Sequence, residues 1–181
     1  MENVVRFLEQ AMRLKSLKRA GWLRCGVGAG ECESVAEHTF GVALLALILP
    51  DGQGVAVDRD RCVALALVHD LAESIVGDIT PHDAIEPAEK HRRERSAMEE
   101  LSRTLGRAGG ELLALWGEFE ADETPEAKLV RELDVIEMAC QARAYQRAGK
   151  LTAAAAEGFI ASARQRVRSG VGRRLLERID M

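Results

Sequence analysis

Two kinds of segment are missing from this 181-residue sequence, a membrane-spanning apolar run and a signal peptide. The longest apolar stretch, GVALLALILP at 41–50, is too short to cross a bilayer. The opening MENVVRFLEQ lacks the order of a basic and then an apolar region that marks a signal peptide. We therefore expect a cytoplasmic protein with no membrane partner.

An excess of positive charge is also missing. The chain has 25 Lys and Arg against 29 Asp and Glu, a formal net charge of −4. This balance argues against general electrostatic attraction to nucleic acid. Small anions remain open as ligands, because a local basic patch can still hold one phosphate.

Cysteine is scarce and irregularly spaced. The four cysteines form no C-x-x-C pair and are too few for a disulfide framework: Cys25, Cys32, Cys62 and Cys140. Reduced thiols are the expectation for an intracellular chain. A zinc site built from Cys25 and Cys32 is a weak alternative, because a glycine-rich segment separates them.

The alternation typical of β-strands is absent, as are internal repeats, whereas helical periodicity recurs from end to end. The sequence therefore predicts an all-α fold, and its length fits a single domain over 1–181. The first helix, about 3–16, is expected to turn five apolar side chains toward the core: Val4, Phe7, Leu8, Met12 and Leu14. Residues 19–33 read as a glycine-punctuated loop.

Capping signals place the helices that follow. Ser34 and Glu37 form a capping box for a helix that runs to about 49, where Pro50 stops it. Asp58 is the expected N-cap of the next helix, which Gly77 ends. A charged helix begins near 87 and a shorter one follows it. Thr124 and Pro125 begin another, ended by Gly149, and one or two amphipathic helices close the chain.

The helix after Asp58 contains LVHDLAESIVGD at 67–78, with ionisable groups inside an apolar run. Burying His69 and Asp70 unpaired would cost several kcal/mol. Glu73 follows them at helical spacings of four and three, which stacks the side chains on one face. An ion at the shared edge would compensate the burial. A buried His–Asp hydrogen-bond pair with Glu73 at its rim is equally consistent with this segment.

Two further residues favour the ion. His38 lies at the start of an apolar helix, and Asp134 occupies the apolar segment LVRELDVIEM. Taken singly, His38 is typical of a satisfied core histidine and Asp134 of a salt-bridge partner. The order His38, then His69 with Asp70, then Asp134 is what indicates a metal shell. His82 and His91 are weaker candidates for the functional site.

This order, H…HD…D on successive helices, resembles the HD-domain metal-dependent phosphohydrolases. The surrounding segments are similar to the 5'-deoxynucleotidase branch, in particular the HD domain-containing protein 2 group, over roughly residues 7–147: LKRAGW, ESVAEHTF, RCVALALVHDLAESIVGDITP, EKHRRERSAM and AKLVRELDVIEMACQARAY. The resemblance implies a single HD-domain helical bundle. Its metal-site core would span about 34–147, and C-terminal helices would occupy about 151–180.

The resemblance also implies a ligand set for one divalent ion: His38, His69, Asp70 and Asp134. Such a mixed nitrogen and oxygen set suits manganese, cobalt, magnesium, iron or nickel, and also accepts zinc. Glu73 and Asp78 are implied as catalytic groups that act on the attacking water and the leaving 5'-oxygen.

Substrate contacts are implied for Arg19, which would grip the phosphate, and for Trp22, which would pack against the sugar and disfavour a 2'-hydroxyl. The residues alone favour a simpler interpretation, in which Arg19 is a surface arginine and Trp22 a packing tryptophan.

The implied reaction converts deoxynucleoside 5'-monophosphates to deoxynucleoside and phosphate, and the implied assembly is a homodimer. Two alternatives remain. An HD phosphohydrolase could act on a nucleoside triphosphate, a cyclic nucleotide or ppGpp. A non-catalytic helical adaptor could keep the metal for stability, in which case Glu73 and Asp78 are dispensable.

Overall fold

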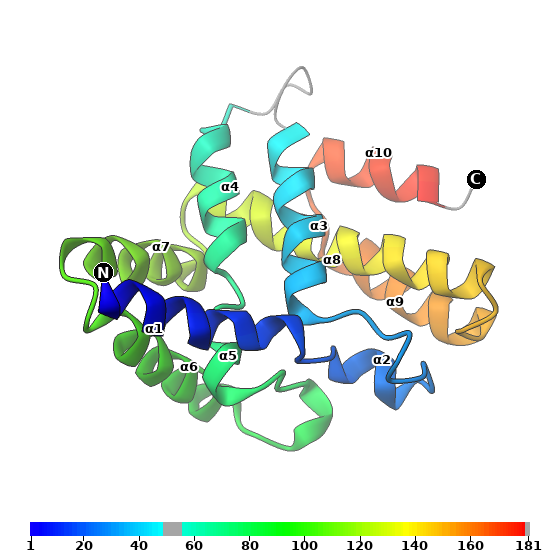
Figure 1. The fold of residues 1–181 in the computed structure, drawn as a ribbon. Helices are drawn as coiled ribbons and strands as arrows, with labels where there is room; N and C mark the ends of the chain where they lie inside the picture. Colours follow the sequence, from blue (N-terminus) through cyan, green and yellow to red (C-terminus); the bar gives the residue numbers. More distant parts are fainter. Residues whose placement is uncertain (49–55, 180–181) are drawn as a thin grey trace.

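The structure, a computed structural model, describes residues 1–48 and 56–179 and is helical throughout, with no β-strand in those two ranges (Figure 1). The expected all-α class is confirmed. Its elements are α1 (Glu2–Ala11), η1 (Met12–Lys15), α2 (Ala20–Arg24), α3 (Val35–Ile48), α4 (Arg59–Val68), α5 (Glu73–Val76), η2 (Pro81–Asp83), α6 (Pro87–Ser102), α7 (Arg107–Ala121), α8 (Pro125–Arg147), α9 (Ala153–Arg166) and α10 (Gly170–Ile179).

Helix α8 is the centre of the bundle, and it packs against α3, α4, α7, α9 and α10 (Figure 1). Its apolar residues lie in the main core together with Val42 of α3, Leu65 of α4 and Ile160 of α9. Full burial of one such Leu or Ile side chain contributes about 1.5–3 kcal/mol. This core fixes the positions of the α3, α4 and α8 segments that carry His38, His69 and Asp134.

The expected helix starts are present as hydrogen bonds. The Ser34 hydroxyl accepts from the Glu37 amide at 3.2 Å, and the Glu37 carboxylate accepts from the Ser34 amide at 2.6 Å, which completes the capping box. The Asp58 carboxylate accepts from the Arg61 amide, and the Thr124 hydroxyl caps α8. The predicted stop at Pro50 lies outside the described residues.

The helix predicted to run from Asp58 to Gly77 is interrupted, and that prediction was wrong in its middle. Helix α4 ends at Val68, and a tight turn precedes α5. The His69 ring donates from Nδ1 to the Ala66 carbonyl at 2.6 Å. In a continuing helix that carbonyl would accept from the Asp70 amide, so the side chain competes with the helix. The turn then closes through a bond from the Glu73 amide to the Asp70 carbonyl.

The first helix also differs from the prediction. It ends at Ala11 and tightens into η1, with Leu14 buried and Phe7 half-buried as expected. Val4, Leu8 and Met12 are instead 44%, 50% and 52% exposed. The reason is that α1 packs by one narrow side against η1 and α5, and no other element of the part of the chain that the structure describes covers these three residues.

Two smaller expectations have definite outcomes. The predicted loop at 19–33 contains a short helix, α2, so that expectation was wrong at 20–24. The C-terminal segment forms two helices, α9 and α10, and α9 packs along α8.

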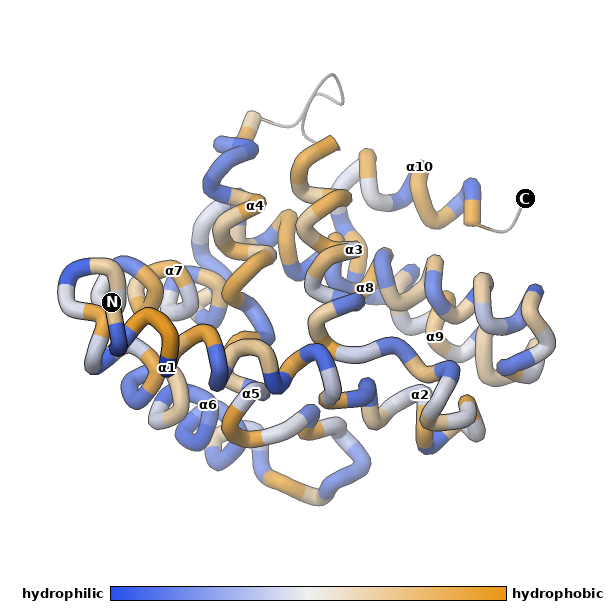
Figure 2. The backbone as a smooth tube through the Cα atoms, in the orientation of Figure 1, coloured by the Kyte–Doolittle hydropathy of each residue, from blue (hydrophilic) through white to orange (hydrophobic). Residues whose placement is uncertain are grey.

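The side of the molecule toward the viewer in Figure 2 is formed largely by α1, α3 and α4, and much of the tube along these helices has the apolar colour. We call the α3–α4 part of it the apolar face, which consists of exposed side chains: Phe40, Leu44, Leu47, Ile48 and Leu67. Among the described helices, none is long and apolar enough to cross a bilayer.

Candidate metal centre and its pocket

His38 and His69 each use Nδ1 in a hydrogen bond, and among the described residues their Nε2 atoms have no hydrogen-bond partner. His38, on the first turn of α3, is fully buried, and its Nδ1 lies 2.6 Å from the Glu137 carboxylate. His69 follows α4 directly, and its Nδ1 bond to Ala66 holds the ring. Both Nε2 atoms are buried and unsatisfied. Since a buried unpaired polar atom costs about 1–3 kcal/mol, these atoms point to a missing ligand.

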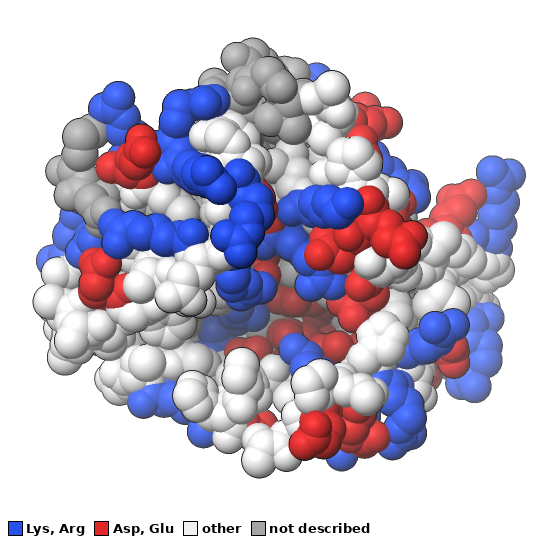
Figure 3. Space-filling view, turned by 180° about the vertical axis from the view of Figure 1, so that it is seen from behind, with Lys and Arg blue, Asp and Glu red and all other residues white. Residues whose placement is uncertain are grey.

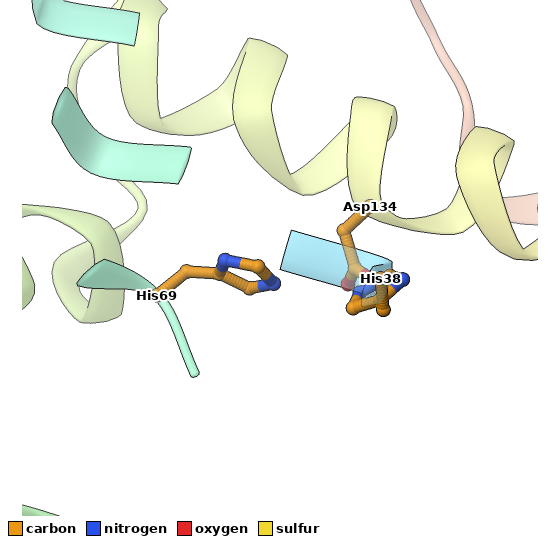
Figure 4. Close-up of side chains that lie close together, drawn as sticks. All are labelled: His38, His69 and Asp134. Carbon is orange, nitrogen blue, oxygen red and sulfur yellow. The ribbon is translucent and has the colours of Figure 1, made fainter. Parts of the chain in front are cut away.

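Asp134 of α8 joins the two rings. Its Oδ1 lies 3.3 Å from His38 Nε2, and ligand atoms of His38, His69 and Asp134 all lie within 4.8 Å of one another. Figure 4 shows the His69 ring directed toward the other two side chains. Two imidazole nitrogens and a carboxylate oxygen at this spacing can hold a divalent cation, which would satisfy both orphaned nitrogens.

Asp70 stands beside this cluster. Its Oδ2 lies 3.3 Å from His69 Nε2, 3.8 Å from His38 Nε2 and 3.2 Å from Arg19 Nη1. Burial raises the pKa of Asp70, but His69, Arg19 and His38 outweigh burial and lower it well below its usual range. Burial likewise raises the pKa of Asp134, but the contact with His38 outweighs burial and lowers the pKa below its usual value. Both acids are therefore carboxylates.

His38 is surrounded by acids. Burial and Arg19 lower its pKa, whereas Asp134 and Glu137 raise it further, to about 10 overall. The site thus carries strong negative potential and attracts positive charge, whether a proton or a metal cation.

Glu73 and Asp78 lie on the same pocket wall but differ in their surroundings. Glu73 is buried, and its Oε2 has no hydrogen-bond partner. Burial first, and then Asp70 and Asp78, raise its pKa well above the ordinary value. Asp78 is engaged with the chain, because its Oδ2 accepts from the Ala20 amide at 2.5 Å and its Oδ1 lies 3.8 Å from Arg19 Nη1.

Arg19 and Trp22 also line this pocket. Arg19 contacts Asp70 beside the cluster of His38, His69 and Asp134, and its side chain is only 14% exposed, so it is not a surface arginine. Burial lowers its pKa, but Asp70 and Asp78 raise it more, and the guanidinium stays charged. Trp22 is 2% exposed, and its Nε1 donates to Glu33 at 2.6 Å. The indole lies 4.2 Å from the Phe159 ring, between ring centroids.

The pocket has a volume of about 640 Å³ and is built by segments from α2 to α9. Figure 3 shows a hollow in the face opposite to that of Figure 1, with acidic side chains inside it and basic ones along its edge. The basic residues that line the pocket are Arg19, Arg24, Lys90, Arg131 and Arg166. The pocket therefore combines an acidic floor for a cation with basic groups for an anion.

Comparison with known proteins agrees with this geometry. Residues 11–172 match the HD domain family. The 5'-deoxynucleotidase HDDC2 of Danio rerio is 43% identical over 147 residues, which cover 81% of this chain and 71% of the relative. The human 5'-deoxynucleotidase HDDC2 is 42% identical over 145 residues, with coverages of 80% and 69%.

The chain belongs to the HD domain family. A crystal structure of the PH0347 protein from Pyrococcus horikoshii OT3 has the same fold, with a TM-score of 0.78 and 28% identity over 97% of this chain and 96% of that one. A conserved hypothetical protein from Pyrococcus furiosus has a TM-score of 0.79 and 26% sequence identity, over 97% of this chain and 98% of that one. The HD-domain prediction, made from the order H…HD…D and five quoted segments, is confirmed.

Several residues of this HD domain were missed from the sequence. Glu137 forms a hydrogen bond with His38, and Glu33 forms one with Trp22. The pocket lining also includes Phe159, Arg131 and Arg166. Glu137 had a usable signal, since it follows Asp134 by three residues on α8 and so lies on the same side. The pocket residues of α7 to α9 carry no local motif.

The weaker candidates are also placed. His82 lines the pocket rim, and His91 stacks on buried Trp116 and contacts Glu120. The four cysteines are free thiols. Cys25 is exposed and Cys32 buried, and neither belongs to a metal-capable group among the residues described.

Proposed function

We propose that this HD domain, over 1–181, hydrolyses deoxynucleoside 5'-monophosphates to deoxynucleoside and phosphate with the help of one divalent metal ion. The observation that carries the proposal is the pair of Nε2 atoms of His38 and His69, which have no hydrogen-bond partner among the described residues and lie 3.3 Å from the carboxylates of Asp134 and Asp70, beside a pocket that also holds Arg19. Relatives of this chain that are more than 40% identical are 5'-deoxynucleotidases by name.

The ligands in this proposal are His38, His69, Asp70 and Asp134. Their two nitrogens and two carboxylates fit manganese, cobalt, magnesium, iron, nickel or zinc. A divalent ion held by these residues would act as a Lewis acid on the phosphoryl group and would lower the pKa of a bound water. Asp70 is the ligand that must exchange a partner, since Arg19 contacts it in the structure.

Arg19 is proposed to bind the phosphate. Its guanidinium lies in the pocket between Asp70 and Asp78, 3.2 and 3.8 Å away. A planar guanidinium can donate two parallel hydrogen bonds to phosphate oxygens. Asp78 also holds the first amide of α2, so it supports the segment that carries Arg19. In this proposal Asp78 anchors that segment beside the leaving 5'-oxygen.

Glu73 is proposed to orient and deprotonate the attacking water. Glu73 lines the pocket, and its Oε2 atom is buried and has no hydrogen-bond partner among the described residues. Repulsion from Asp70 raises its pKa in the structure, and a cation beside Asp70 would relieve that repulsion and favour the ionised base.

Trp22 is proposed to restrict the sugar. Its indole nitrogen is already bonded to Glu33, so the ring offers the pocket an apolar surface beside Phe159. An apolar surface leaves a 2'-hydroxyl without a hydrogen-bond partner, which disfavours ribonucleotides by about 1–3 kcal/mol.

Phosphate release from a substrate panel tests the proposal. dAMP should be turned over at least tenfold more efficiently than AMP, and more efficiently than dATP, cyclic AMP or ppGpp. Equal kcat/KM for dAMP and AMP would remove the deoxy preference and the role of Trp22. Preference for dATP, cyclic AMP or ppGpp would favour another HD phosphohydrolase, and no turnover at all would favour the adaptor.

We further propose that the protein is a cytoplasmic homodimer that buries the apolar face. Phe40, Ile48 and Leu67 are 65%, 63% and 56% exposed. Helices α3 and α4, which carry these residues, lie on the side of the molecule toward the viewer in Figure 2, whereas the hollow of Figure 3 opens on the other side, so self-association through α3 and α4 would leave access to the pocket.

A further inference from the structure

Glu137 has no place in the proposed ligand set, yet its carboxylate accepts a hydrogen bond from the ring of His38. It lies on α8 three residues after Asp134, so the two acids approach the same ring from one helix. Its Oε2 is 2.6 Å from His38 Nδ1, while Asp134 Oδ1 is 3.3 Å from Nε2. One acid thus contacts each nitrogen of a fully buried imidazole.

The opposite helix provides space for Glu137. Gly41 follows His38 by three residues on α3, where that helix packs against α8. A Cβ atom at Gly41 would lie 2.7 Å from Glu137 Oε1 and 2.8 Å from its Cγ. Contacts that short are not tolerated, so any larger residue at 41 would displace the carboxylate from the ring. The absence of a side chain at Gly41 thus leaves the space that the Glu137 carboxylate occupies beside the His38 ring.

A metal ion between His38 and Glu137 is the competing explanation, because Glu33, His38 and Glu137 also form a metal-capable group. Ligand atoms bound at about 2.1 Å to one ion lie roughly 3 Å apart. The 2.6 Å separation of Nδ1 and Oε2 is shorter than that and is the length of a charge-assisted hydrogen bond. The contact is a hydrogen bond.

We propose that Glu137 is a positioning residue: it accepts the Nδ1–H of His38 and thereby directs the Nε2 lone pair into the metal centre. The inference rests on the proposed metal site. A carboxylate in this position fixes the tautomer and the ring orientation of a histidine ligand and raises its basicity. His69 reaches the same result through a backbone carbonyl, which explains why its side chain needs no acid partner on Nδ1.

Binding of Co²⁺ tests the proposal without a need for turnover. Four variants of the full chain are titrated while the visible spectrum of Co²⁺ is followed: Glu137→Gln, Gly41→Ala, His38→Ala and Glu132→Gln. Glu137→Gln keeps the volume and removes the charge, and Gly41→Ala keeps the charge but displaces it. Glu132→Gln is the control, because that carboxylate also lies on α8 but binds Ser169.

Glu137→Gln and Gly41→Ala should each raise the dissociation constant for Co²⁺ about 10- to 100-fold and change the Co²⁺ spectrum. Glu132→Gln should leave both unchanged even if it lowers the melting temperature. In the Zn²⁺-loaded protein, the downfield Nδ1–H proton resonance of His38 should move upfield in Glu137→Gln. Should Gly41→Ala not fold, the two Glu137→Gln readouts decide alone.

The outcomes separate this inference from the proposed metal site. If His38→Ala binds Co²⁺ as tightly as the wild type, the proposed site itself is wrong. If His38→Ala loses binding while Glu137→Gln keeps the wild-type affinity and spectrum, the metal site stands and the positioning role is overturned.

Discussion

His38 and His69 are both proposed metal ligands, but different Nδ1 partners hold their rings in place. The chain order of His38, His69, Asp70 and Asp134 was sufficient to predict that these residues converge, and the structure brings them together. The Nδ1 partners could not be predicted. One is a carboxylate on a distant helix and the other a carbonyl freed where α4 ends, so both depend on packing and on a local helix break.

Replacement of Glu73 tests the proposed base. Glu73→Gln keeps the size of the side chain but removes its ability to accept a proton, so kcat for dAMP should fall about 100-fold or more. The dissociation constant for Co²⁺ should change by less than threefold, because Glu73 is no ligand. Exposed Glu99→Gln on α6 is the control. Retention of more than a third of the wild-type kcat by Glu73→Gln would contradict the assignment.

Glu33 gives the metal-free protein a pH-dependent stability. Burial and the neighbouring Glu137 raise its pKa from about 4.5 to about 7, despite the hydrogen bond from Trp22. The folded state therefore holds the proton more tightly than the unfolded chain. The resulting stabilisation is complete below about pH 4.5 and is lost as the pH rises through 7.

Glu33→Gln cannot ionise and keeps an acceptor for Trp22. In the presence of chelator, its melting temperature relative to the wild type should therefore increase between pH 5 and pH 8. Thermal unfolding followed by circular dichroism measures the difference at both values. A difference that is the same at pH 5 and pH 8 would show that the Glu33 carboxyl is not perturbed.

At the scale of elements, the break between α4 and α5 determines where Asp70, Glu73 and Asp78 point. The predicted continuous helix would have stacked His69, Asp70 and Glu73 on one face. The turn instead presents His69 and Asp70 to the metal cluster, and Gly77 then redirects the chain so that Asp78 reaches α2. Periodicity alone could not reveal this break, because the residues on both sides of it favour helix.

Gly77 is the position in this segment that only glycine tolerates well. Its φ of 82° and ψ of 168° lie in a region nearly closed to other residues. Gly77→Ala should lower the free energy of unfolding by about 1–3 kcal/mol and reduce activity, because Glu73 and Asp78 flank it. Gly117→Ala on α7, where a Cβ meets open space, should instead raise stability by up to about 1 kcal/mol. Urea unfolding measures the change in unfolding free energy for both variants. Equal changes in Gly77→Ala and Gly117→Ala would contradict the proposed backbone strain at position 77.

At the scale of the whole molecule, the sequence was informative about class and family but not about the walls of the pocket. Capping boxes and Pro–Gly punctuation act locally, so they predicted most helix starts. Phe159, Arg131 and Arg166 meet the site only because α7, α8 and α9 fold around it. The predicted burial of Val4, Leu8 and Met12 was wrong because an amphipathic pattern shows only that one helix face is apolar. It does not show whether another element covers that face.

The apolar face should be the dimer contact. The double variant Phe40→Arg and Leu44→Arg places two charges on one side of α3, and should raise the dimer dissociation constant at least 100-fold. Sedimentation equilibrium from 1 to 100 μM measures it. Leu23→Arg on α2, outside the apolar face, is the control. A wild type that is monomeric across this range would contradict the homodimer.

The central claim is that the His38–His69 cluster holds the metal that hydrolysis requires, and phosphate release from dAMP tests it most directly. Wild-type protein should lose activity with chelator and regain it with Mn²⁺ or Co²⁺, while His69→Ala, folded by circular dichroism, should stay at least 1,000-fold below the wild type under all three conditions. Wild-type turnover that survives chelation, or His69→Ala turnover at the wild-type rate, would contradict the account.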